Sequence, residues 1–137
     1  MKEQIRPRIL LVDDEVNVLE GLRRNLRPFF DVTTADSPDQ ALKLVATQGP
    51  YEVVVSDLRM PEMDGIALLC SIRKVSPDTV RVLLTGFGDM NSIIAAVNEG
   101  NVFRFLSKPC PPWALTRALE DSVRQYRLST AGCAAGK

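Results

Sequence analysis

Short apolar runs alternate along the chain with longer segments in which apolar residues recur every three or four positions. The short runs predict five strands, at about residues 8–13, 31–34, 52–57, 80–84 and 102–106. The longer segments predict five helices, at about residues 15–27, between Ser37 and Gly49, after Gly65, at about 89–99 and at about 112–128. Strands that alternate with helices in this way are typical of an α/β fold built on a parallel sheet.

The last predicted helix has an apolar side and a charged side. The apolar side carries Leu115, Leu119, Val123 and Tyr126. The charged side carries Arg117, Glu120, Asp121, Arg124 and Arg127. A solvated face explains these charges most simply, and a surface for a partner is the alternative. Residues 129–137 are small and patternless, so we expect a linker or an added tail after a domain at residues 1–128.

Composition narrows the class of protein. The 137 residues are 45% hydrophobic, enough for one domain with one core, and the formal net charge is zero. Without a block of lysine or arginine, direct binding to nucleic acid is not expected. Three cysteines without a CxxC pair fit a reducing compartment, and the first apolar run is too short for a signal peptide or a membrane span. We therefore expect a cytoplasmic protein.

Polar residues stand where four of the predicted strands end. Asp13 and Asp14 follow the first strand and Asp57 ends the third, while Thr85 and Lys108 follow the last two. Ligands of open parallel sheets bind at this carboxyl edge, and carboxylate oxygens suit Mg²⁺. Each residue also has a commonplace explanation, such as a helix N-cap for the aspartate pair or a surface position for the lysine. Their joint occurrence predicts a divalent-cation site that handles a phosphoryl group.

Formal charges predict how such a site would switch. Three carboxylates are balanced by Mg²⁺ and Lys108, and phosphorylation of Asp57 adds about one excess negative charge. Thr85 is the nearest hydroxyl at a strand end and can turn toward a phosphoryl oxygen. Phe105 could fill the space that Thr85 leaves, which would change the surface. The alternative is that Phe105 is simply a core residue of its strand.

Four segments together resemble the receiver domain of bacterial two-component response regulators. They are Val12-Asp13-Asp14-Glu15, the run from Asp57 to Gly65, Leu84-Thr85-Gly86 and Leu106-Ser107-Lys108-Pro109. The resemblance covers about residues 7–128. It implies a flavodoxin-like fold, a doubly wound parallel sheet of five strands in the order 2-1-3-4-5 with helices on both faces. A weaker resemblance is to receivers that head multidomain regulators, including HD-GYP phosphodiesterases.

The family resemblance assigns roles to individual residues. It implies that Asp57 accepts a phosphoryl group, with Thr85 as the switch hydroxyl and Lys108 as the phosphate-binding lysine. It implies direct Mg²⁺ ligands from Asp14, Asp57 and the backbone carbonyl of Arg59, with Asp13 acting through water. It also implies a cis bond between Lys108 and Pro109. Phe105 stands where the family commonly has tyrosine.

The resemblance also implies partners. The chain contains no histidine, so a phosphohistidine donor must come from a sensor histidine kinase or a phosphotransfer protein. A downstream output domain or protein would respond to a surface at residues 89–99, 102–106 and 112–128, through which a homodimer can also form. No membrane partner is expected. The domain's own chemistry would be limited to accepting the phosphoryl group and losing it slowly, so it would not be an enzyme in the usual sense.

Two other classes of protein share parts of this pattern. One is a pseudo-receiver that acts as a protein-binding adaptor, against which the intact set of Asp, Thr and Lys residues argues. The other is a haloacid-dehalogenase-like phosphohydrolase, which needs a second aspartate where Arg59 stands. Arg59 and Phe87 lie two residues beyond Asp57 and Thr85, so we expect both to modulate access of water to the phosphoryl group and slow its hydrolysis.

Overall fold

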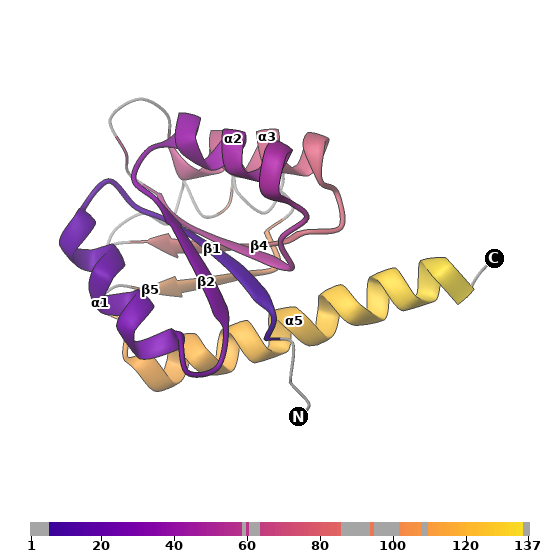
Figure 1. Cartoon of the computed structure of the whole chain (residues 1–137). Helices are drawn as coiled ribbons and strands as arrows, with labels where there is room; N and C mark the ends of the chain where they lie inside the picture. Colours follow the sequence, from indigo (N-terminus) through magenta and orange to yellow (C-terminus); the bar gives the residue numbers. More distant parts are fainter. Residues whose placement is uncertain are drawn as a thin grey trace.

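The computed structural model describes residues 6–58, 60, 64–85, 94, 102–107 and 110–135, the last five by their backbone alone (Figure 1). Within them the elements are β1 (Arg8–Val12), α1 (Val16–Leu26), β2 (Asp31–Ala35), α2 (Pro38–Gln48), β3 (Val53–Asp57), α3 (Gly65–Val75), β4 (Val80–Thr85), β5 (Arg104–Ser107) and α5 (Pro112–Ala135). Each matches a predicted element. The helix predicted at about 89–99 lies outside the described residues, apart from Ile94.

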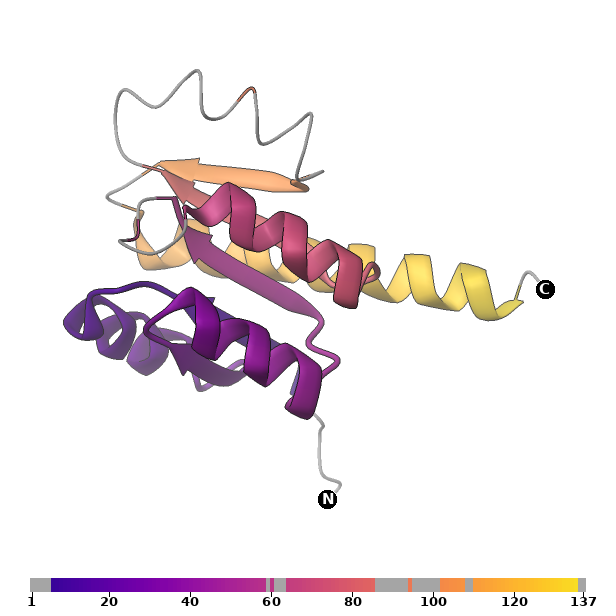
Figure 2. The ribbon, with the colours of Figure 1, turned by 90° about the horizontal axis from the view of Figure 1, so that it is seen from above.

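The five strands form one parallel sheet in the order β2-β1-β3-β4-β5. Helices α2 and α3 cover one face and α1 and α5 cover the other (Figures 1 and 2). The predicted doubly wound order is therefore confirmed. This topology brings the carboxyl ends of β1, β3 and β4 together at one edge of the sheet.

The two faces of the sheet have separate cores because successive side chains of a strand point to opposite sides. In β3, Val54 packs with α2 and α3, whereas Val53 and Val55 pack with α1 and α5. Every residue of β3 and of β4 is buried. Strands covered on both faces read as continuous apolar runs, which is why the sequence reveals them.

Capping residues set the beginnings of two helices. Ser37 is the N-cap of α2, and its hydroxyl accepts a hydrogen bond from the backbone N–H of Gln40, with Pro38 at the first helical position. Asp64 caps α3 in the same way by accepting from the N–H of Ala67 at 2.8 Å. The second cap fixes where α3 starts, directly beside the end of β3.

Helix α5 is longer than the sequence pattern predicts. It continues to Ala135 rather than ending at residue 128, and it projects past the sheet (Figure 1). Hydrogen bonds within the helix accompany this part, such as the one from the Thr130 hydroxyl to the carbonyl of Tyr126 at 2.9 Å. The predicted helix end was wrong because a helix without a packing partner needs no apolar periodicity. The domain boundary at residue 128 stays a prediction.

Candidate functional site

Three carboxylates meet at the carboxyl edge of the sheet. Oxygen atoms of Asp13, Asp14 and Asp57 all lie within 4.8 Å of one another. Asp57 is the last residue of β3, and β1 pairs with that strand up to Val12, the residue before Asp13. The backbone N–H of Asp13 bonds to the carbonyl of Ala35 at 3.2 Å and so extends the sheet by one residue. The predicted meeting of the three aspartates is confirmed.

The three carboxylates differ in exposure. Asp13 is 2% exposed and Asp57 7%, whereas Asp14 faces solvent. Charged groups of one sign crowded together and largely removed from water repel one another, and a hard divalent cation relieves the repulsion while accepting six oxygen ligands. The donor set is all oxygen, with one side open to water, so these residues fit Mg²⁺.

Asp13 also has the commonplace role that its position allows. One of its carboxylate oxygens accepts a hydrogen bond from the backbone N–H of Glu15 at 2.9 Å, just before α1 begins. Asp14 is not the N-cap of α1, because Glu15 occupies that position. Local turn formation and membership in the acidic cluster therefore coexist in Asp13.

The backbone around Asp57 is held from several sides. The N–H of Leu58 donates to the carbonyl of Leu84 at 3.0 Å, and the carbonyl of Leu58 accepts from the N–H of Gly65 at 2.7 Å. The Ser56 hydroxyl donates to the carbonyl of Asp57 at 2.9 Å. These bonds fix the end of β3 against both β4 and the first residue of α3.

Gly65 is a residue of this site that the sequence analysis missed. A β-carbon at residue 65 would lie 2.3 Å from the carbonyl oxygen of Asp57 and 3.0 Å from the α-carbon of Leu58. Contacts this short with backbone cannot be relieved by turning a side chain. The glycine directly after the Asp64 cap is the only signal in the sequence, and it does not reveal which backbone approaches.

Thr85 lies at the same edge, as predicted. It is the last residue of β4 and is 2% exposed, and the pairing of Asp57 with Leu84 makes it a close neighbour of the acidic cluster. Leu83 pairs with Phe105, and Thr85 pairs with Ser107. Thr85 and Phe105 therefore lie on the same face of the sheet, two residues apart in register.

Phe105 is half-buried and packs against the core beneath α2 and α3. It is neither a fully buried core residue nor an exposed one. Its position beside Thr85 suits a switch, and its packing suits a partial role in the core. Both interpretations made from the sequence remain open, and the switch stays a prediction.

Several predicted residues lie outside the described part of the chain: Arg59, Phe87, Lys108 and Pro109. The roles of Arg59 in metal binding, of Arg59 and Phe87 in hydrolysis and of Lys108 in phosphate binding stay predictions, as does the cis bond at Pro109. Cys110, which follows them, is half-buried. Burial raises the pKa of the Cys110 thiol, which favours an inert neighbour over a reactive one.

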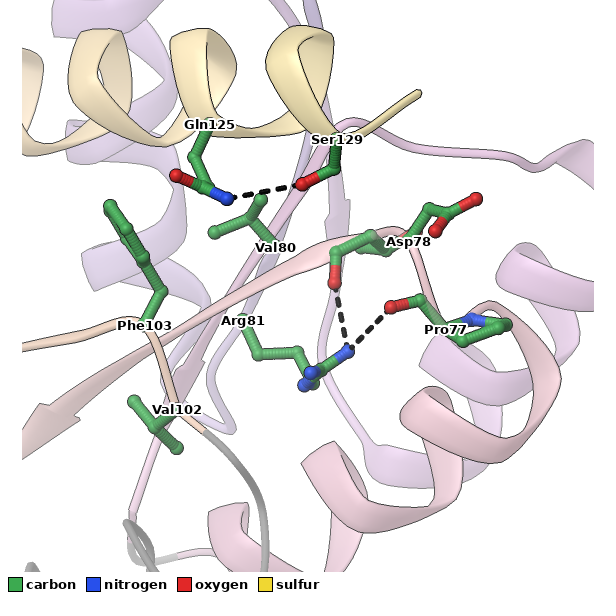
Figure 3. A pocket seen from close by; sticks show the side chains of 9 residues that line it. Pro77, Asp78, Val80, Arg81, Val102, Phe103, Gln125 and Ser129 are labelled. Carbon is green, nitrogen blue, oxygen red and sulfur yellow. Dashed lines mark hydrogen bonds between the residues drawn. The ribbon is translucent and has the colours of Figure 1, made fainter. Parts of the chain in front are cut away.

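A hollow of about 360 Å³ lies away from this edge, where β4 and β5 begin and the second half of α5 passes (Figure 3). Arg81 lines it, and its guanidinium donates to the carbonyls of Pro77 at 3.3 Å and Thr79 at 2.9 Å. Burial lowers the pKa of Arg81, and the positive charge of Arg73 lowers it further. None of the three aspartates lines this hollow, so it is separate from the candidate site.

Comparison with known proteins gives consistent matches. Residues 9–120 match the family model of the response regulator receiver domain. The chain is 40% identical over 124 residues to the transcriptional regulatory protein GlrR of Escherichia coli K12, covering 89% of this chain and 27% of GlrR. It spans about a quarter of the length of that regulator and of the hydrogenase regulator HoxA.

Solved structures agree with this match. A receiver domain of an HD domain-containing protein from Pseudomonas fluorescens Pf-5 has a TM-score of 0.87 and 36% identity, with 96% of each chain covered. A structure described as adenylate cyclase from Rhodopirellula baltica has a TM-score of 0.89 and 42% identity, covering 93% of this chain and 94% of that one. The same fold thus occurs in structures that are named for different activities.

Proposed function

This chain belongs to the response regulator receiver domain family, and on that premise we propose that Asp57 is its phosphoacceptor, served by Mg²⁺ at Asp13, Asp14 and Asp57. The family's standard function is to accept a phosphoryl group in two-component signalling. The observation that carries the assignment to Asp57 is its place among the three carboxylates, whose oxygens lie within 4.8 Å of one another.

The backbone around Asp57 supports its proposed role as the nucleophile. Hydrogen bonds from Leu58 and Ser56 and the close approach of Gly65 hold the end of β3. In the proposed step, a carboxylate oxygen of Asp57 forms a bond to phosphorus while the bond from phosphorus to the donor atom breaks. The electron pair of that bond leaves with the donor, and Asp57 becomes an acyl phosphate.

The proposed metal ligands follow the acidic cluster. Asp14, Asp57 and the backbone carbonyl of Arg59 would bind Mg²⁺ directly, and Asp13 would bind it through water. When bound, Mg²⁺ would neutralise carboxylate charge and the charge on the transferring phosphoryl group. Lys108 and Thr85 would donate to the phosphoryl oxygens, and movement of Thr85 would release space for Phe105.

The donor and the output lie outside this chain. The sequence contains no histidine, so a sensor histidine kinase or phosphotransfer protein is proposed as the phosphoryl donor. The family's named relatives here are transcriptional regulators rather than classical enzymes. The proposal for this chain includes a downstream output domain or protein and a homodimer through residues 89–99, β5 and α5. It also includes slow self-dephosphorylation limited by Arg59 and Phe87, and a cytoplasmic location. Among the described residues, no helix is both long and apolar enough to cross a membrane.

Mass spectrometry of the intact protein tests the assignment. Incubation with Mg²⁺ and phosphoramidate should add one phosphoryl group to the wild type and none to Asp57→Asn, because an amide is not a nucleophile toward phosphorus. Asp31→Asn, which changes an exposed aspartate at the start of β2, is the matched control and should be phosphorylated normally.

Other outcomes would contradict the proposal in distinguishable ways. An undiminished adduct in Asp57→Asn would move the acceptor to another residue. A wild type that forms no adduct at any Mg²⁺ concentration would favour the pseudo-receiver adaptor. Release of phosphate from the donor over many turnovers per protein molecule would favour a phosphohydrolase.

A further inference from the structure

Five arginines gather at the amino-terminal edge of the sheet, away from the acidic cluster. A hollow of about 480 Å³ is lined by Arg6, Arg8, Arg23 and Arg27 together with Phe30, Asp31 and Val32. A second hollow of about 200 Å³ continues it along α1, where Arg24 and Glu20 join Arg23 and Arg27. We call the five arginines that line the two hollows the arginine cluster.

The arginine cluster concentrates positive charge on a chain whose net charge is zero. Five arginines face two carboxylates, those of Glu20 and Asp31, which gives the described residues that line the two hollows a net formal charge of +3, whereas the whole chain has a formal net charge of zero. Because exposed charges within about 10 Å of one another act together at ordinary ionic strength, this edge presents a local positive field.

Two members of the cluster have structural roles. The guanidinium of Arg6 donates to the carbonyl of Arg27 at the end of α1. Arg8 donates to the carbonyls of Gln48 and Pro50, at 2.7 and 3.1 Å, and lies 4.5 Å from the centre of the Tyr51 ring. Helix ends attract such cations because their last carbonyls lack partners within the helix.

The arginines on α1 are not used in this way. Arg23 has one carboxylate neighbour, Glu20, at 4.0 Å, and within the described part of the chain the side chains of Arg24 and Arg27 have no ion-pair partner. Arg23 and Arg27 are one helical turn apart, so their side chains lie on one face of α1 with β-carbons about 5–6 Å apart. Two guanidinium groups at this spacing suit two oxyanions carried on one ligand.

We propose that the arginine cluster binds an acidic peptide segment of a partner protein. The arginines of α1 are exposed and the two hollows form one continuous surface, which suits an extended chain better than a small molecule that must be enclosed. Asp31 within the lining and the neutral chain argue against the polyphosphate backbone of nucleic acid. Asp13 lies five positions after Arg8 along β1 and its extension, roughly 16.5 Å at 3.3 Å per residue, so this surface is distinct from the proposed phosphoacceptor site.

Fluorescence anisotropy tests the proposal with a fluorescein-labelled peptide of alternating glutamate and glycine. Binding to the whole chain at low salt should weaken about tenfold when Arg23→Ala and Arg27→Ala are combined, since two exposed ion pairs are lost. Lys43→Ala with Lys74→Ala removes the same charge from exposed positions of α2 and α3 and should bind as the wild type does. Asp57→Asn should also bind normally, which separates this proposal from the proposed function.

Three results would overturn the proposal. Equal weakening in the arginine and lysine variants would show electrostatic attraction without a site. Equal binding of the same peptide with glutamine in place of glutamate would show that the carboxylates are not recognised. Tighter binding of a labelled DNA duplex that is lost in the arginine variant would assign the surface to nucleic acid. Arg23→Gln with Arg27→Gln keeps good helix formers at both positions and repeats the test if the alanine variant unfolds.

Discussion

The two edges of the sheet differ in how their charged side chains are arranged. At the carboxyl edge, Asp13, Asp14 and Asp57 crowd like charges together, an arrangement that a cation would stabilise. At the amino edge, strands begin with arginines whose charges are met locally, since Arg8 and Arg81 donate to carbonyls and Arg104 pairs with Asp121 at 3.2 Å. We infer that charges paired within the fold hold it together, whereas charges of one sign that crowd together mark where another molecule binds.

This comparison separates the arginines themselves. Arg81 is 6% exposed and bonded to the turn before its own strand, which is a structural role. Arg27 is exposed and has no ion-pair partner among the residues that the structure describes. Arginine therefore stabilises the fold at position 81 and belongs to a proposed binding surface at position 27.

The largest expected effect comes from a substitution that disturbs the backbone at the carboxyl edge. Gly65→Ala places a β-carbon 2.3 Å from the carbonyl oxygen of Asp57, so the end of β3 must move. We expect a loss of about 3 kcal/mol in the free energy of unfolding, the upper end of the usual cost of overpacking because backbone cannot yield, and about a tenfold slower phosphorylation. Urea denaturation and the rate of adduct formation measure the two effects.

Gly21→Ala is the matched control for that change. Gly21 lies in α1, and a β-carbon there would have no neighbour within 4 Å. Alanine favours the helix over glycine by about 0.5–1 kcal/mol, so this variant should be slightly more stable and phosphorylate normally. Equal stability and equal phosphorylation rates in the two variants would show that the close approach of Gly65 to Asp57 does not matter for function.

The next prediction compares neutralisation at the two edges in the absence of Mg²⁺. Arg81→Ala should destabilise the domain by about 1–3 kcal/mol, because the carbonyls of Pro77 and Thr79, of which the second is buried, lose a donor. Asp57→Asn should instead stabilise it by about 1 kcal/mol, because one of three crowded like charges is removed. The free energy of unfolding in EDTA measures both.

Adding Mg²⁺ sharpens this comparison. The wild type and Arg81→Ala should gain stability with the ion, by about 2.7 kcal/mol at one hundred times the dissociation constant, whereas Asp57→Asn should gain much less. A loss of stability on Asp57→Asn in EDTA would mean that repulsion among the three carboxylates does not dominate their contribution to stability. The contrast between the two edges would then fail.

Much of this molecule could be predicted from its sequence, for a physical reason. Strands buried on both faces must be apolar throughout, so each ends visibly where a polar residue such as Asp57 or Thr85 begins. Parallel order then brings these ends together without further information. The same logic could not reveal Gly65, because its importance depends on which backbone lies within reach after α3 has packed.

The contacts at the amino edge were harder to predict from the sequence, because they too depend on which segments lie close together after folding. Arg81 interrupts an apolar strand, and nothing local shows that the turn at Pro77 supplies carbonyls for it. The arginine cluster joins Arg6 and Arg8 to Arg23, Arg24 and Arg27, which lie at least 15 positions further along, so no single stretch of the sequence contains all five. The end of α5 was missed because its last turns have no core to face.

The smallest expected effect concerns the ion pair between Arg104 at the start of β5 and Asp121 of α5. Their side chains are 41% and 26% exposed, so water screens the attraction, and Arg124 competes for the same carboxylate at 3.3 Å. Asp121→Asn should therefore cost less than about 1 kcal/mol of unfolding free energy, and the cost should shrink as salt rises. Asp121→Asn combined with Arg104→Gln should cost little more than the single change, because each removes the same interaction. A cost above that range, or a cost that does not change with salt, would show that this ion pair is shielded from water as Arg81 is. Arg104, on the last strand of the sheet, would then count with Arg81 as an arginine that stabilises the fold.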